Sequence, residues 1–171
     1  DQTVSQKVLE EYFIPGGRSE GQPYKRCATP TAQPSLFLNQ LNVVGSFVEV
    51  WLAKEGHDGL VGINFLEKIQ VALLPGIYGA MLAGVDYVLV GAGIPREVPG
   101  VLDLFAKQQD ATLKLNVLGA TSEQEFRVEF SPARVFPEMA LAPMKRPRFI
   151  GIISSTTLAI HLAKKATGKV D

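Results

Sequence analysis

The chain has 171 residues, the length of one ordinary domain, with 46% hydrophobic and 20% charged residues. Seventeen basic residues balance seventeen acidic ones, so no net field favours nucleic acid or an anionic membrane as a partner. We therefore expect a single globular domain, residues 1–171, that binds neither.

The most apolar region, residues 71–95, is interrupted by Pro75, Asp86 and five glycines. A membrane span needs roughly 20 predominantly apolar residues, so this region is predicted to be a helix followed by a buried strand. Cys27 is the only cysteine, which excludes an internal disulfide and favours a reducing compartment. The predicted location is the cytoplasm.

The first third of the chain predicts two helices. Residues 1–13 form the first, and residues 14–34, rich in Gly, Pro, Thr and Gln, predict an irregular connection. Residues 43–55 have helical spacing, and Gly56 can close that helix in a left-handed turn. The apolar stripe of this helix, which we expect in the core, comprises Val44, Phe47, Val48, Trp51 and Leu52.

A repeating order of strands and helices follows. Short apolar runs predict strands buried on both faces, and each is followed by a helical pattern. This alternation implies parallel pairing and an α/β fold. The predicted strands are 60–65, 87–90 and 149–153, and the predicted helices are 75–83, 96–108 and 155–167.

Three junctions ahead of strands resemble one another, namely KEGHDGL, LAGVDYV and ATGKVD. In each, a glycine (Gly56, Gly84 or Gly168) is expected to end a helix, and an aspartate follows it (Asp58, Asp86 or Asp171). The first two lead into strands. The third places Asp171 where a further strand is expected to begin.

Residues 111–147 interrupt this order. ATLKLNVLG and QEFRVEF alternate apolar and polar residues, as a half-exposed antiparallel hairpin does, and four prolines follow them. We interpret this segment as a hairpin inserted on one edge of the α/β body.

The stretch YVLVGAGIP, residues 87–95, has three interpretations. Dinucleotide binding requires Gly-x-Gly-x-x-Gly, but Arg96 occupies the place of the third glycine. Pro95 fits the first turn of the following helix, which leaves Gly91, Ala92 and Gly93 as a surface poor in side chains at a strand's C-terminal end. A flat ring can bind at that edge of a parallel sheet, while a plain tight turn needs the same glycines.

The remaining candidates have ordinary structural explanations beside the functional ones. Ser154 and Ser155 follow a strand and suit either helix N-capping or a pocket. Glu67 and Lys68 follow another strand end, as a solvated loop pair or as pocket residues. His57 and His161 have no His, Cys or acid at ligand spacing, so we predict no metal site.

Three stretches together carry a resemblance to a known family: GLVGINFL, AGVDYVLVGAGIP and RFIGIISSTTLAIHLAKKATGKVD. They resemble the nitronate monooxygenases, once called 2-nitropropane dioxygenases, which are related to FMN-dependent enoyl reductases of fatty-acid and polyketide synthesis. The strings YFIPGG and FVEVWLAKEGHDG extend the resemblance over nearly all of residues 8–171.

The resemblance implies a TIM barrel that holds FMN at the C-terminal ends of its strands. Asn64 matches an asparagine beside the flavin. Gly91, Ala92 and Gly93 match the turn that lines the flavin and substrate pocket, and Ser154 and Ser155 match small polar residues at the next strand end. The implied function is a flavin-dependent oxidoreductase that oxidises a small-molecule substrate such as a nitronate, using oxygen.

Two strands at the family's beginning, its catalytic histidine and its phosphate-binding loops have no counterpart in residues 1–171. A whole TIM barrel takes roughly 250 residues, so we expect a partial barrel whose catalytic residue is unknown. One alternative is an enoyl reductase that uses the same flavin. The other is a catalytically incomplete barrel fragment that forms a homo-oligomer or binds a complementing chain.

Overall fold

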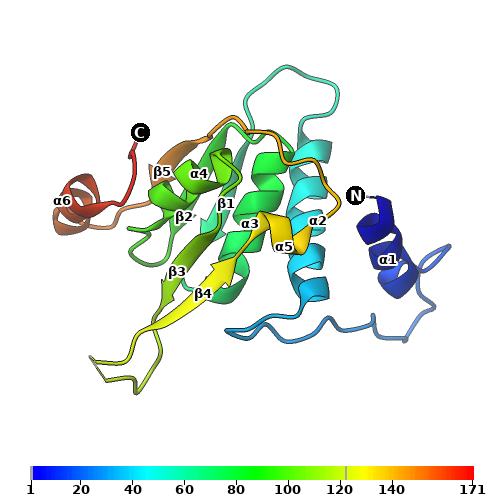
Figure 1. Cartoon of the computed structure of the whole chain (residues 1–171). Coiled ribbons are helices and arrows are strands. Elements are labelled where there is room, and N and C mark those ends of the chain that lie inside the picture. The colour runs from blue at the N-terminus through cyan, green and yellow to red at the C-terminus, as the bar shows by residue number, and fades with distance from the viewer. Residues whose placement is uncertain (1, 122) are drawn as a thin grey trace.

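The computed structural model describes residues 2–121 and 123–171. Its centre is a three-stranded parallel sheet in the order β1-β2-β5, with helices against one face (Figure 1). The α/β prediction is confirmed, and the described residues form an open sheet. The strands are β1 (Gly62–Leu66), β2 (Tyr87–Gly91) and β5 (Arg148–Gly151), followed by α3 (Gln70–Leu82), α4 (Val98–Ala106) and α6 (Thr156–Lys165).

The two faces of this sheet have different surroundings. Val88, Val90 and Phe149 point to the helix-covered face and are fully buried. The pairing aligns Asn64 with Leu89 and Ile150 on the opposite face, where Asn64 and Ile150 are exposed. Parallel sheets are normally covered on both faces. The uncovered side, called the open face below, comprises Gly62, Asn64 and Leu66 of β1, Tyr87, Leu89 and Gly91 of β2, and Arg148 and Ile150 of β5.

Helix α2 (Leu36–Ala53) packs closely against α3 (Gln70–Leu82) at Gly79, and Gly76 of α3 lies against β1, because neither glycine has a side chain. A Cβ on Gly79 would overlap the backbone carbonyl of Val43, and one on Gly76 would lie 3.0 Å from the Phe65 ring. The small residues of α3 thus permit close packing on its neighbours. Ser35 caps α2 by accepting a hydrogen bond from the Leu38 N–H at 3.2 Å.

Trp51 was predicted to lie in the core, and this prediction is wrong. Helix α2 buries Val43 and Val50 against its neighbours, whereas Trp51 is 56% exposed and Val48 and Leu52 are exposed beside it. The helix is apolar on more than one side, so its stripe does not identify the side that meets α3. Among the described residues, α2 alone is long and apolar enough to cross a membrane, a test that core helices also pass.

Three helix starts differ from the prediction. Helix α2 begins at Leu36, not Val43, because Ser35 provides its cap. Helix α3 begins before Pro75 and keeps the proline inside, since the turn ahead of it buries Leu73 and Leu74. Helix α4 begins at Val98, so Pro99 takes the first-turn position expected of Pro95.

The predicted hairpin is confirmed as β3 (Ala111–Leu115) and β4 (Phe126–Phe130), paired antiparallel. It forms a sheet of its own that packs on α3 and α4. Phe130 and Phe136 surround Tyr78 together with Phe105, with ring centroids 5.1 to 6.3 Å from the Tyr78 ring. Helix α5 (Pro132–Val135) follows β4.

The two ends of the described chain lie on opposite sides of the body (Figure 1). Helix α1 (Gln2–Tyr12) buries Val4 and stacks Tyr12 on Phe37, with ring centroids 6.4 Å apart. Helix α6 packs Leu162 against Gly151 of β5. Gly56 and Gly84 adopt left-handed φ angles of 76° and 75° as predicted, whereas Gly168 instead lies against the backbone of Pro99 and Gly100.

Candidate functional site

Of the six residues predicted to contact a cofactor, five lie at or just beyond the strand ends, whereas Asn64, expected at a strand end, lies in the middle of β1. Because the three strands are parallel, their C-terminal ends meet at one edge of the sheet. Asn64 lies on the open face near this edge and is exposed. Within the described residues its side-chain amide makes no hydrogen bond, so it is free to bind a ligand.

The turn after β2 is less bare than its sequence indicates. Gly91 is buried, and its carbonyl accepts a hydrogen bond from the Glu67 N–H at 2.8 Å. A Cβ on Gly91 would lie 3.1 Å from the Ile152 side chain, and one on Gly93 would overlap the Glu67 carboxylate. Only Ala92 is exposed, with a left-handed φ of 56° that a non-glycine residue seldom adopts. The turn therefore presents Ala92 to solvent and holds the β1–α3 loop with its two glycines.

The strand-end serines have different roles. Ser155 caps α6, because its hydroxyl accepts a hydrogen bond from the Leu158 N–H at 3.2 Å, and the capping interpretation is confirmed for this residue. Ser154 is exposed and has no hydrogen bond within the described residues. Of the pair, Ser154 is the one available to a ligand.

A cavity of about 450 Å³ lies on the helix side of the same turn. Of the six predicted residues, Gly93 alone lines it. Its walls come from four segments of the chain. These are the β1–α3 loop with the first turn of α3, the β2–α4 loop with the start of α4, the end of β3 with the residue after it, and helix α6. The lining includes Glu67, Gln70, Leu73, Arg96, Val98, Leu113, Lys114, Asn116 and His161.

Glu67 is the titratable group that this cavity perturbs most clearly. Burial against the turn raises the pKa of its carboxyl group, since no cation or hydrogen-bond donor compensates for the lost water. Its position one residue after β1 could have indicated this, because that position faces the C-terminal edge of the sheet. The solvated-loop interpretation is wrong for Glu67, whose carboxyl group lies against Gly93 and lines the cavity.

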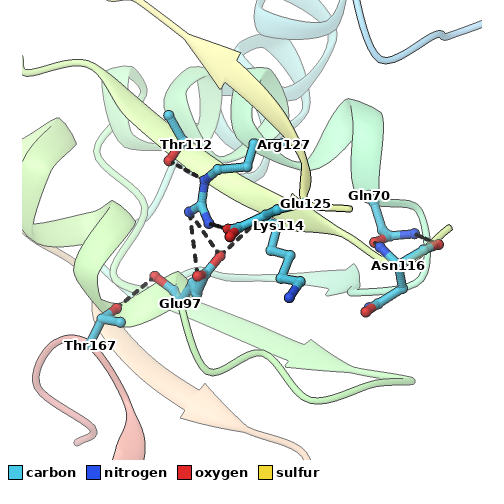
Figure 2. A network of polar contacts seen from close by, with 8 residues as sticks. All are labelled: Gln70, Glu97, Thr112, Lys114, Asn116, Glu125, Arg127 and Thr167. Atoms are coloured by element: carbon cyan, nitrogen blue, oxygen red, sulfur yellow. Dashed lines mark hydrogen bonds and ion pairs between the residues drawn. The ribbon is translucent and has the colours of Figure 1, made fainter. Parts of the chain in front are cut away.

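Four residues that line the cavity, Gln70, Glu97, Lys114 and Asn116, belong to the polar contacts drawn in Figure 2. Glu97 accepts hydrogen bonds from the Lys114 N–H at 2.8 Å and from the Arg127 guanidinium at 3.4 Å. Gln70 and the backbone of Asn116 exchange two hydrogen bonds of 2.6 and 3.3 Å, which join α3 to the hairpin. The positive charge of Arg127 thus compensates the negative charge of the Glu97 carboxylate. The hydrogen bonds that Glu97 and Gln70 accept also hold the hairpin beside the cavity.

The histidines lie apart from each other. The His57 ring bridges the Ala53 carbonyl at 2.7 Å and the Gly59 N–H at 2.9 Å, which organises the α2–β1 turn. His161 lines the cavity. Within residues 2–121 and 123–171, no three His, Cys, Asp or Glu side chains gather closely enough to hold a metal ion.

No family model, curated protein or solved structure matches the chain. The fold and site define an α/β protein with a parallel sheet, one open sheet face, and a cavity with apolar and charged walls at the C-terminal edge of its strands.

Proposed function

We propose that the chain forms part of the wall of an FMN-binding (β/α) barrel and acts in flavin-dependent oxidation of a small substrate, most like nitronate monooxygenation. The observation that supports this proposal is the open face of the sheet. In a barrel, strands carry helices on the outside and turn their other face to the interior. Strands from outside residues 1–171, or from a second copy, would complete such a wall.

The residues of the open face suit the ring of FMN. Leu66, Leu89 and Ile150 offer an apolar surface, and the unpaired amide of Asn64 offers both a donor and an acceptor to the polar edge of a ring. The phosphate has no such match. Arg148, the cation of this face, lies at the N-terminal ends of the strands, with its guanidinium 5.8 Å from the Tyr87 ring centroid. We assign the described residues to the ring alone.

The chemistry that FMN supplies when bound is acceptance of an electron pair from the substrate. The chain's own residues would position the FMN ring and shield it from water. Asn64 would orient the ring by hydrogen bonding, and Ile152 would exclude water above Gly91, against which it packs. The left-handed backbone of Ala92 would hold the exposed part of the turn at the rim.

The test is flavin binding by the purified chain, read from the visible absorbance spectrum and flavin fluorescence polarisation with added FMN. We expect a protein-bound flavin spectrum, with affinity about fivefold weaker in Asn64→Ala, the loss of one net hydrogen bond. Asn39→Ala, which removes an amide from α2, is the matched control. Turnover of a nitronate with oxygen supports the proposed oxidation. Reduction of an enoyl thioester with NAD(P)H instead replaces the proposed function with that of an enoyl reductase.

A second candidate, a non-catalytic partner in an assembly, is favoured by the apolar character of the uncovered surfaces. Leu66, Ile150 and Ile152 are exposed on or beside the open face, and the unpaired edges of β1 and β5 can accept further strands. A colourless protein that leaves FMN free and self-associates in sedimentation experiments would replace the flavoprotein proposal with this one.

A further inference from the structure

The cavity behind the Gly91–Gly93 turn is a second place where a ligand can bind, separate from the open face. Its deepest walls are Leu73 of α3, Val98 of α4 and Leu113 of β3, each no more than 7% exposed. Those helices cover the opposite side of the sheet from Asn64. A volume of about 450 Å³ is within the range of small-molecule sites.

The rim of this cavity carries two cationic side chains that are not engaged in an ion pair, although the pKa of Glu125 is lowered by its hydrogen bond from Arg127 and then by the charge of Lys114. The side chains of Arg96 and Lys114 both line the cavity, and within the described residues neither makes an ion pair or a side-chain hydrogen bond. In Figure 2 the Lys114 ammonium extends away from the network around Glu97. Among the described residues, seven lysines and arginines form ion pairs (Lys25, Lys54, Arg127, Arg134, Lys145, Arg146 and Lys169) and the others do not. What sets Arg96 and Lys114 apart is that both line the same hollow.

Two acidic residues, Glu67 and Glu97, also line the cavity, and they differ in how much they offset its positive charge. Glu97 is already paired with Arg127. Glu67 is the one that burial shifts toward its neutral form. His161 of α6 is the remaining ionisable side chain of the lining.

We propose that this cavity binds a short-chain carboxylate, with its carboxylate group between Arg96 and Lys114 and its alkyl chain against Leu73, Val98 and Leu113. The cationic rim selects an anionic head, and charge-assisted hydrogen bonds to planar oxyanions are the strong ones. The buried apolar floor selects a hydrocarbon tail. A fully polar oxyanion such as phosphate leaves that floor unfilled.

Glu67 makes this binding depend on pH. An anion beside Glu67 disfavours its ionised form, so the ligand binds with uptake of one proton, and the neutral carboxyl group can donate a hydrogen bond to it. Affinity then falls as the pH rises through the pKa of Glu67, and the titrations are made above about pH 5.5, where an alkyl carboxylic acid with a pKa like that of free Glu stays ionised. Glu67→Gln keeps a neutral donor at every pH and removes this dependence.

The test is titration of the whole chain with sodium butyrate, followed by backbone amide NMR shifts. We expect the amides of Gly93, Glu97, Leu113 and Asn116 to move, and 1-butanol, which lacks the charge, to leave them in place. Acetate, shorter by two methylenes, binds about tenfold more weakly. Arg96→Gln and Lys114→Gln each weaken butyrate binding by roughly tenfold. Arg26→Gln and Lys164→Gln, which lie outside the cavity, leave it unchanged.

The titrations at several pH values separate the two ionisable candidates. Affinity in Glu67→Gln stays constant with pH, whereas His161→Gln retains the wild-type dependence. The reverse result overturns the role of Glu67. An absence of amide shifts, an equal response to butanol, or rim variants with wild-type affinity overturns the site itself. FMN plays no part in this assay, so butyrate binding by a chain that binds no flavin refutes the proposed function alone.

Discussion

Asp86 joins three segments at the N-terminal ends of the strands, and its substitution by asparagine tests how the sheet is stabilised. Its Oδ2 accepts hydrogen bonds from the Lys54 ammonium at 2.7 Å and from the Val61 N–H at 3.1 Å, and its Oδ1 accepts one from Lys145 at 3.1 Å. The carboxylate thereby connects the end of α2, the start of β1 and the segment ahead of β5.

The cost of Asp86→Asn follows from these contacts. Hydrogen bonds to charged groups contribute about 1.5–3 kcal/mol each, but asparagine keeps one acceptor oxygen. The Lys145 side chain is 74% exposed, so water screens its share, while the Asp86 side chain is only 10% exposed. We expect a loss of about 2–3 kcal/mol, since the amide NH₂ faces a lysine that the carboxylate had bound.

Urea denaturation followed by circular dichroism measures this difference, and thermal unfolding should show a Tm lower by about 4–10 °C. The hydrogen bond from Lys54, then that from Val61 and that from Lys145, hold the pKa of Asp86 well below its usual range. A carboxyl group whose pKa is lower in the folded than in the unfolded state stabilises the fold at pH values above its unfolded-state pKa. This stabilisation is lost as the pH falls toward the folded-state pKa. The gap between wild type and Asp86→Asn should therefore shrink progressively below about pH 4.

The matched control is Asp58→Asn, at the equivalent junction ahead of β1. Asp58 is exposed and has no hydrogen bond or ion pair within the described residues, so we expect a change within about 0.5 kcal/mol. Equal losses for the two variants, or a gap for Asp86→Asn that does not change in acid, would refute the reasoning.

Two further predictions concern packing and the aromatic cluster. Gly79→Ala should cost about 1–3 kcal/mol because its Cβ meets the Val43 carbonyl, whereas Gly45→Ala in α2, with open space around it, should gain up to about 1 kcal/mol in urea denaturation; equal effects would contradict the close contact. Tyr78→Phe should cost about 1 kcal/mol by removing the hydrogen bond from its hydroxyl to Gln108 Oε1 at 2.7 Å. Burial raises the pKa of Tyr78 to about 12 despite that bond, so ultraviolet titration of the wild type should contain a late phenolate step that Tyr78→Phe lacks.

The strands were predictable because each depends on a local signal. Residues 87–91 combine an apolar run with flanking glycines, and the strand occupies Tyr87–Gly91. Burial on both faces was wrong for Asn64 and Ile150, because covering the open face requires elements that the described residues do not contain. Trp51 was misplaced for a different reason, since α2 is apolar on more than one side and its stripe does not identify the side that packs on α3.

The cavity was beyond prediction for a different reason. Glu67, Lys114 and His161 stand far apart in the sequence, and they reach one cavity only because the hairpin packs on α3 and α4 and α6 follows β5 to the same edge of the sheet. Each residue alone has an ordinary explanation, as a loop charge, an exposed strand residue or a helix surface residue. Their shared environment is a property of the tertiary contacts.

The three junction aspartates, Asp58, Asp86 and Asp171, share a local sequence pattern but contribute differently to the stability of the fold. Asp86 accepts the Val61 N–H beside β1, and Asp171 likewise accepts the Phe149 N–H of β5 at 3.0 Å. Burial opposes ionisation of Asp171, but Lys169, the Phe149 N–H and Arg146 outweigh it and lower its pKa to about 2.

Asp58 has the same local sequence, but among the described residues no strand pairs with the far edge of β1 to supply an N–H. The aspartate is thus a device for joining one parallel strand to the next, and it stabilises the fold only where that neighbouring strand is present. A chain or segment that paired with the free edge of β1 would be expected to protect the Asp58 carboxylate as Val61 and Lys54 protect that of Asp86.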